Sequence, residues 1–302
     1  MIRLITYLIV ILIGFTTSFA QVKSEEILIK NEGVELPGTL SFSEEKTPLL
    51  IWIHGSGGVD RNGNTPQYIK QFRDSINANK IAFFSYDKRT ANKNNIVFLK
   101  QGVLFNDFVL DAKTVINHFK KDNRFSEIIL VGHSQGSLIA MLASEKTDKY
   151  ISLAGAGETI DKTLVRQLSA QNPVLGQSVK SHLKELMETG TIKEVNPMLA
   201  GMFSKQNLPF LRSWISINPT DEIKKITLPI LILNGTKDLQ VPVKDAENLH
   251  NANPSSKLVL IKNMNHVLKD IQKDQDNLKS YYSADFPLST TLIKTVVTFV
   301  KK

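Results

Sequence analysis

Residues 128–136 read Ile-Ile-Leu-Val-Gly-His-Ser-Gln-Gly, and this stretch decides the fold that we expect for the chain. Its apolar residues predict a buried strand, and the run from Leu138 to Lys146 predicts a helix directly after it. A Gly-X-Ser-X-Gly sequence between a strand and a helix is typical of a sharp turn that carries a nucleophile. The two glycines remove side chains that would collide as the backbone bends and lifts the Ser134 hydroxyl into a cleft. Ser134 is therefore the candidate nucleophile.

An acid and a histidine follow two later strands, where a serine nucleophile would need them. Asp238 comes shortly after the apolar run Pro229–Leu233, and His266 comes shortly after the run Leu258–Ile261. Because the carboxyl ends of parallel strands meet at one edge of a sheet, all three side chains can converge there. The chain order Ser, Asp, His is the order found with this kind of turn. We therefore predict Ser134 as the nucleophile, His266 as the general base and Asp238 as the acid that orients the histidine.

Further apolar runs recur along the chain and alternate with helical patterns. Apolar residues recur at helical spacing across residues 105–119, which predicts an amphipathic helix, and a closing helix is predicted across residues 292–300. This alternation indicates the α/β class, with a mostly parallel central sheet covered by helices on both faces and joined by right-handed crossovers. The remaining predicted strands are Glu26–Lys30, Val34–Ser41, Pro48–Ile53, Ile81–Tyr86 and Tyr150–Leu153.

One long segment interrupts this alternation. Between Gly155 and about Lys225, helical patterns such as Leu164–Leu168 and Val179–Met187 are broken repeatedly by proline and glycine. A loop of about seventy residues without structure would be exceptional in a compact domain, so we predict an inserted helical cap over about residues 156–225. Residues 21–302 would then form a single α/β domain that contains this insertion.

The first twenty residues have the pattern of a secretory signal peptide. Arg3 supplies a positive charge, Leu4–Phe15 form an apolar run, and residues 18–20 (Ser-Phe-Ala) put small side chains before a cleavage site at Gln21. The apolar run is short against the ~20 apolar residues of a membrane-spanning helix, which favours cleavage over an uncleaved anchor. We therefore predict a signal peptide over residues 1–20, an exported protein that is periplasmic or secreted, and no stable membrane span after cleavage.

Composition narrows the possible chemistry. The chain is 42% hydrophobic, enough for a sizeable core, and its lack of cysteine excludes disulfides, thiolate zinc sites and a cysteine nucleophile. No histidine pair stands at the spacing of helical metal ligands, and the glycines after His54 lack the spacing of a dinucleotide-binding turn, so we expect neither metal nor cofactor. The net charge of +8 comes from thirty lysines and only seven arginines, without a basic block. A solvated lysine surface is therefore favoured over a nucleic-acid partner.

Three further stretches complete a resemblance to a known superfamily. They are residues 33–38 (Gly-Val-Glu-Leu-Pro-Gly), residues 54–57 (His-Gly-Ser-Gly) and residues 86–89 (Tyr-Asp-Lys-Arg). With the turn at Ser134, the chain resembles the α/β-hydrolase superfamily, and most of all its bacterial serine esterase and aminopeptidase-like branch. It departs from that pattern at Thr90 and Ser137, where many relatives have glycine. The resemblance implies an oxyanion hole formed by the backbone N–H groups of Ser56 and Gln135.

These features predict a serine hydrolase that works through a covalent acyl-enzyme. We predict a carboxylesterase that acts on small or medium acyl esters. Two alternatives remain: a serine peptidase of the same fold, aminopeptidase-like, whose cap would bind a charged peptide terminus, and a non-catalytic binding protein on a hydrolase scaffold. The joint presence of Ser134, Asp238 and His266 argues against the binding protein, which would not require all three. Asp245 is available as a substitute for Asp238.

Overall fold

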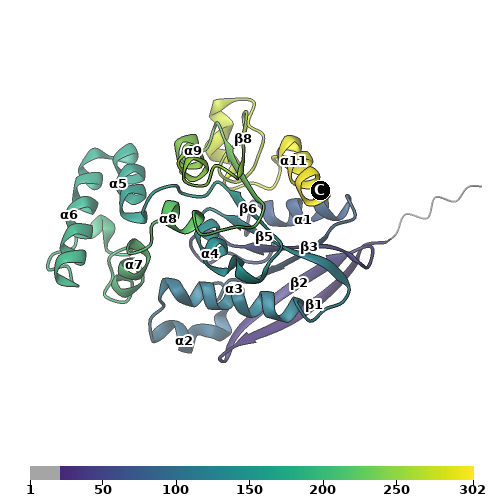
Figure 1. Ribbon diagram of the computed structural model, residues 1–302. Helices are drawn as coiled ribbons and strands as arrows, with labels where there is room; N and C mark the ends of the chain where they lie inside the picture. Colours follow the sequence, from purple (N-terminus) through teal and green to yellow (C-terminus); the bar gives the residue numbers. More distant parts are fainter. Residues whose placement is uncertain (1–20) are drawn as a thin grey trace, which may run out of the picture.

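The computed structural model describes residues 21–302, and the predicted signal peptide over residues 1–20 lies outside the described residues. The strands are β1 (Lys23–Asn31), β2 (Val34–Phe42), β3 (Thr47–Ile53), β4 (Ala82–Tyr86), β5 (Phe125–His133), β6 (Lys149–Leu153), β7 (Ile230–Gly235) and β8 (Lys257–Ile261). They form one sheet in the order β1-β2-β4-β3-β5-β6-β7-β8 (Figure 1). β2 pairs antiparallel with β1 and β4, whereas β4, β3, β5, β6, β7 and β8 run parallel. The predicted mostly parallel sheet is confirmed.

Two hydrophobic clusters cover the two faces of the sheet. Successive strand residues alternate between them, so that Ile51 of β3 packs into one cluster and Trp52 into the other. Because both faces are covered, the central strands are buried throughout, which explains their continuous apolar runs. The helices are α3 (Phe105–Phe119), α4 (Gln135–Ala143) and α9 (Val243–Ala252) in the first cluster, and α1 (Tyr68–Asn77) and α11 (Thr290–Val300) in the second.

The chain between β6 and β7 forms a separate group of helices at one end of the molecule (left in Figure 1). They are α5 (Ile160–Gln171), α6 (Pro173–Thr189) and α7 (Leu208–Ile215), here named the cap helices, followed by α8 (Pro219–Ile223), which packs on the sheet side. A third hydrophobic cluster, which includes Val179 and Leu186 of α6, holds the cap helices together. α6 begins after Asn172, whose side chain accepts a hydrogen bond from the N–H of Val174, and it ends at Gly190.

The remaining helical elements are short. They are α2 (Ile96–Lys100), α10 (Asn277–Ser280) and the 3-10 turns Lys93–Asn95, Ser144–Lys146, Pro197–Leu199 and Asp274–Asp276. Among residues 21–302, we find no helix with both the length and the apolar character needed to cross a membrane.

Three parallel strands end at the same edge of the sheet and carry the candidate residues just beyond their ends. Ser134 follows β5, Asp238 follows β7 and His266 follows β8. The last two loops approach each other closely at Gly235, where an added Cβ would lie only 2.0 Å from the carbonyl oxygen of Met264. Only glycine permits that approach, so the sequence at the end of β7 brings the Asp238 and His266 loops together.

Candidate active site

Ser134 lies in a sharp turn between β5 and α4. Its backbone has φ +54° and ψ −121°. Neither flanking glycine has room for a side chain: a Cβ at Gly132 would lie 2.4 Å from the Gly136 oxygen, and one at Gly136 would lie 2.1 Å from the Ile53 oxygen. The glycines are therefore needed for the chain to bend here, and the bend places Ser134 at the wall of a large cavity.

A hydrogen bond joins Asp238 to His266. Nδ1 of His266 lies 2.8 Å from Oδ2 of Asp238, and the two side chains are 5% and 0% exposed. The other carboxylate oxygen, Oδ1, accepts hydrogen bonds from the backbone N–H groups of Gln240 and Val241, both at 2.8 Å. The loop therefore fixes the carboxylate, and the carboxylate fixes the imidazole ring. A proton on Nδ1 leaves Nε2 of His266 as the proton acceptor.

His133, the residue before the serine, ties the turn to the His266 loop. Its Nε2 atom donates to the backbone oxygen of His266 (2.8 Å), and the two rings lie 4.9 Å apart between centroids. Burial lowers the pKa of His133 to about 3, so this ring is neutral near pH 7. Among residues 21–302, the hydrogen bonds include none between the Ser134 hydroxyl and the His266 ring. The structure thus joins Asp238 to His266 and brings the backbone of His266 to the turn of Ser134.

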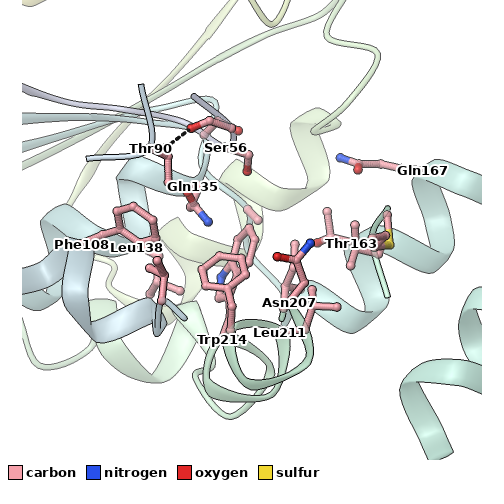
Figure 2. A pocket seen from close by; sticks show the side chains of 18 of the residues that line it. Ser56, Thr90, Phe108, Gln135, Leu138, Thr163, Gln167, Asn207, Leu211 and Trp214 are labelled. Carbon is pink, nitrogen blue, oxygen red and sulfur yellow. Dashed lines mark hydrogen bonds between the residues drawn. The ribbon is translucent and has the colours of Figure 1, made fainter. Parts of the chain in front are cut away.

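The backbone N–H groups of Ser56 and Gln135 have no protein acceptor among the hydrogen bonds of the described residues. Gln135 is the first residue of α4, where N–H groups lack partners within the helix. Ser56 lies in the glycine-rich loop after β3, and a Cβ on Gly55 would lie 3.3 Å from the Cβ of Ser134. Both donors therefore belong to segments that border the serine, and both residues line the same cavity (Figure 2).

The last residue of β4 and the segment after it hold this glycine-rich loop in place. The backbone oxygen of Tyr86 is bonded to Nε2 of His54, and the hydroxyl of Thr90 donates to the Gly57 oxygen (3.0 Å). Burial lowers the pKa of His54 to about 4, so its ring is also neutral near pH 7. The motif at residues 86–89 therefore has a physical role, because it helps to position the loop that carries Ser56. In the sequence analysis, this motif served only as part of a resemblance.

Lys88 is a residue of the site that sequence reasoning missed. Its ammonium group donates to the Gly55 oxygen and to Oε1 of Gln135, both at 2.7 Å, and lies 4.4 Å from the ring centroid of Phe108. Burial lowers the pKa of Lys88 to about 7. The acceptors lie 33 and 47 positions away in the chain, so only the fold shows this contact.

A cavity of about 580 Å³ lies between the sheet edge and the cap helices. Its wall on the cap side includes Trp214, whose indole packs against the rings of Phe105 and Phe210 with centroids 5.3 Å and 5.6 Å apart. Amide and hydroxyl groups lie among these apolar side chains. Figure 2 shows the two sides facing each other: Phe108, Gln135 and Leu138 from α3 and α4, and Thr163, Gln167, Leu211 and Trp214 from α5 and α7.

The other acids near the cavity bind protein groups of their own. Asp245, the alternative acid, accepts a hydrogen bond from the N–H of Gly157 and pairs with Arg166, both at 2.8 Å. Arg166 also pairs with Glu158. Asp245 therefore attaches the start of the cap segment to α9, and it is Asp238 that contacts the histidine. In the described part of the chain, no three His, Asp or Glu side chains are grouped so as to hold a metal ion.

The whole architecture recurs in solved structures of low sequence identity. Est1E from Butyrivibrio proteoclasticus superposes with a TM-score of 0.60 at 18% identity over 92% of this chain and 99% of that one, and a second structure of Est1E contains bound ferulic acid. The esterase Pf2001 from Pyrococcus furiosus superposes with a TM-score of 0.60 at 16% identity over 93% of this chain and 91% of that one. These similarities establish the fold.

Sequence comparison places the chain in a family. Esterase EstD from Thermotoga maritima is 23% identical over 246 residues, which are 77% of this chain, and this chain spans only 58% of the length of EstD. The BD-FAE family model matches residues 40–252, most of the chain. The resemblance to the α/β-hydrolase superfamily predicted from the sequence is thus confirmed, and the chain belongs to the BD-FAE family.

Proposed function

We propose that this protein is a serine hydrolase that cleaves carboxylic esters through a covalent acyl-enzyme. The observation that carries the proposal is the buried hydrogen bond between His266 and Asp238, in loops that adjoin the sharp turn of Ser134. A serine hydroxyl is a weak nucleophile, and it needs a neighbouring base whose ring is held in one orientation. The relatives described as esterases support the same activity.

Each residue has a defined role in this mechanism. Ser134 attacks the ester carbonyl carbon while Nε2 of His266 takes the hydroxyl proton, and the same proton then passes to the leaving alcohol. Asp238 holds the Nδ1–H tautomer and stabilises the imidazolium that forms for a short time. The negative charge on the tetrahedral intermediate is bound by the N–H groups of Ser56 and Gln135. Water then repeats the sequence and releases the acid.

The cavity supports an ester with a small or medium acyl group. Its volume of about 580 Å³ lies in the range of small-molecule sites, and the aromatic group around Trp214 offers an apolar surface to the acyl chain. Est1E, which has the same fold, binds ferulic acid, an aromatic acid, and this favours including aromatic acyl groups among the substrates tested. A peptidase is less well supported, because the two charged side chains that residues 21–302 contribute to the cavity wall, Lys88 and Glu158, are already bound to protein groups.

We also propose that the enzyme acts outside the cytoplasm, on the basis of the sequence of residues 1–20. N-terminal sequencing of the protein recovered outside the cytoplasm checks this: the first residue should be Gln21. A protein that is recovered there with Met1 intact contradicts cleavage.

A labelling and turnover experiment tests the activity. The purified protein is treated with a fluorophosphonate and then assayed with p-nitrophenyl esters of increasing acyl length beside aminoacyl p-nitroanilides, with Ser134→Ala as the matched control. We expect labelling of Ser134 and ester turnover in the wild type, and a loss of kcat of about 10⁶-fold in the variant. Absence of both labelling and turnover in the folded wild type would refute the proposal, and faster anilide than ester cleavage would favour the peptidase.

A further inference from the structure

Lys88 is a buried lysine whose role the mechanism above leaves unexplained, and burial lowers its pKa to about 7. Only 4% of its surface is exposed, and within residues 21–302 it forms no ion pair. The nearby acid, Asp111, forms an ion pair with the neighbouring Arg89 instead (2.6 Å between Nε and Oδ2). The Lys88 ammonium meets two neutral oxygen atoms and the face of Phe108. Burying a charge without a counter-ion is costly, so its presence beside the active site requires a reason.

The two oxygen atoms belong to the two segments that carry the candidate oxyanion donors. One is the carbonyl oxygen of Gly55, and this carbonyl shares a trans peptide group with the N–H of Ser56. In a planar trans peptide, the C=O and the N–H point in opposite directions, so a hydrogen bond that fixes the Gly55 carbonyl also fixes the direction of the Ser56 N–H. The other oxygen is Oε1 of Gln135, the residue that supplies the second N–H.

We propose that Lys88 is a positioning residue of the oxyanion hole and acts through the Gly55–Ser56 peptide group and through Gln135. This inference rests on the proposed esterase function. The ammonium group draws electron density toward the Gly55 oxygen, which makes the Ser56 N–H a stronger donor. When the substrate oxygen becomes negative, it also supplies a counter-charge that stabilises the protonated form of Lys88. Both effects favour the transition state over the bound substrate, so they raise kcat.

A purely structural role for Lys88 is the competing explanation. The glycine-rich loop is already fixed by bonds that do not involve the Lys88 side chain, and an apolar side chain of similar length would fill the same volume without removing a charge from water. A charge therefore adds little to the fold that packing could not supply. The other bonds are His54 to the Tyr86 oxygen, the Thr90 hydroxyl to the Gly57 oxygen, and the Lys88 N–H to the Val59 oxygen.

Two matched substitutions separate these explanations. Lys88→Met removes the charge and keeps the length of the side chain. Lys149→Met is the control, because Lys149 is also buried (9% exposed) but donates to Glu127 and Val300 at the opposite end of β6. With p-nitrophenyl acetate, we expect Lys88→Met to lose about 10²- to 10³-fold in kcat, the cost of one oxyanion donor, with KM within about threefold. Lys149→Met should keep the kcat of the wild type.

A trifluoromethyl ketone supplies a readout that a structural role would not change. Such a ketone forms a tetrahedral oxyanion with the active serine, so Lys88→Met should bind it about 10²-fold more weakly. If Lys88→Met does not fold, the wild type labelled with ¹³C-lysine gives the same information. In that protein, the pKa of Lys88, which lies near 7, should rise by about one unit or more when the adduct forms, because a negative charge appears nearby.

The outcomes distinguish the two proposals. A wild type that neither labels with fluorophosphonate nor hydrolyses esters contradicts the proposed function. An active wild type whose Lys88→Met variant retains kcat and ketone affinity contradicts the role of Lys88 alone. An unchanged Lys88 pKa in the adduct does the same.

Discussion

The sheet edge and the cap helices hold their polar side chains in different ways. At the edge, the Asp238 carboxylate accepts three hydrogen bonds, two of them from its own loop. In the cap, Gln167 and Asn207 each make a single side-chain hydrogen bond within residues 21–302, to the Gln240 and Gly201 oxygens. The proposed reactive groups are thus fixed by short loops at the sheet edge, whereas the cap side of the pocket wall comes from helices with a small core of their own. We infer that the rate of the chemical step and the choice of acyl group can be altered separately.

The largest expected effect comes from breaking the sheet-edge side. Asp238→Asn should lower kcat by about 10⁴-fold for every ester, because an amide favours the wrong tautomer of His266 while it leaves the geometry intact. Steady-state kinetics with p-nitrophenyl acetate and octanoate measure this. The matched control is Asp245→Asn, which loosens the attachment of the cap and should spare acetate turnover. If Asp245→Asn showed the larger loss of kcat, the assignment of the acid would be wrong.

A smaller and more selective effect is expected on the cap side. Trp214→Ala removes an aromatic surface from the cavity wall and should reduce kcat/KM for octanoate by about 10- to 100-fold, with little change for acetate. Trp214→Phe retains most of that surface and serves as the control. Kinetics across an acyl-length series check the prediction. An equal loss for all acyl lengths would show that the cap also controls the chemical step.

The smallest effect concerns the free energy of unfolding in acid, and it tests whether His133 at the sheet edge is buried as a neutral ring. The pKa of His133 is about 3 in the folded protein, whereas the unfolded chain protonates this ring near 6.5. The unfolded state therefore binds more protons between these values, and the free energy of unfolding decreases by up to about 1.4 kcal/mol for each unit by which the pH is lowered. His133→Gln should reduce that slope. Urea unfolding at pH 7, 6 and 5 measures it, and identical slopes for the two proteins would show that the pKa of His133 is the same in the folded and unfolded states.

The sequence was sufficient to locate Ser134, Asp238 and His266 as candidates because each follows an apolar run that is a strand in the structure. A buried parallel strand needs a continuous apolar run, and the chemistry of this fold class lies just beyond the end of such strands. Candidate residues near strand ends can therefore be located from the sequence alone. The sequence predicted that Asp238 and His266 could converge, and the structure was needed to show the hydrogen bond between them.

Lys88 and the cap were less accessible from sequence for different reasons. Lys88 acts on groups 33 and 47 residues away, so no local pattern reveals its contacts. In the cap, the predicted helical stretches Leu164–Leu168 and Val179–Met187 fall inside α5 and α6 but cover only part of them. These helices bury a narrow face, so their apolar pattern is weak, and their lengths are set by packing against one another.

The backbone of Ser134 has a consequence for how the protein can change. A non-glycine residue at φ +54° costs about 1–3 kcal/mol, which the rest of the fold must offset. Glycine would relax that turn at no steric cost, and it would also remove the hydroxyl that we propose as the nucleophile. If Ser134 acts as proposed, a substitution at this position that raises thermal stability would abolish turnover, so selection for heat resistance alone would yield an inactive protein.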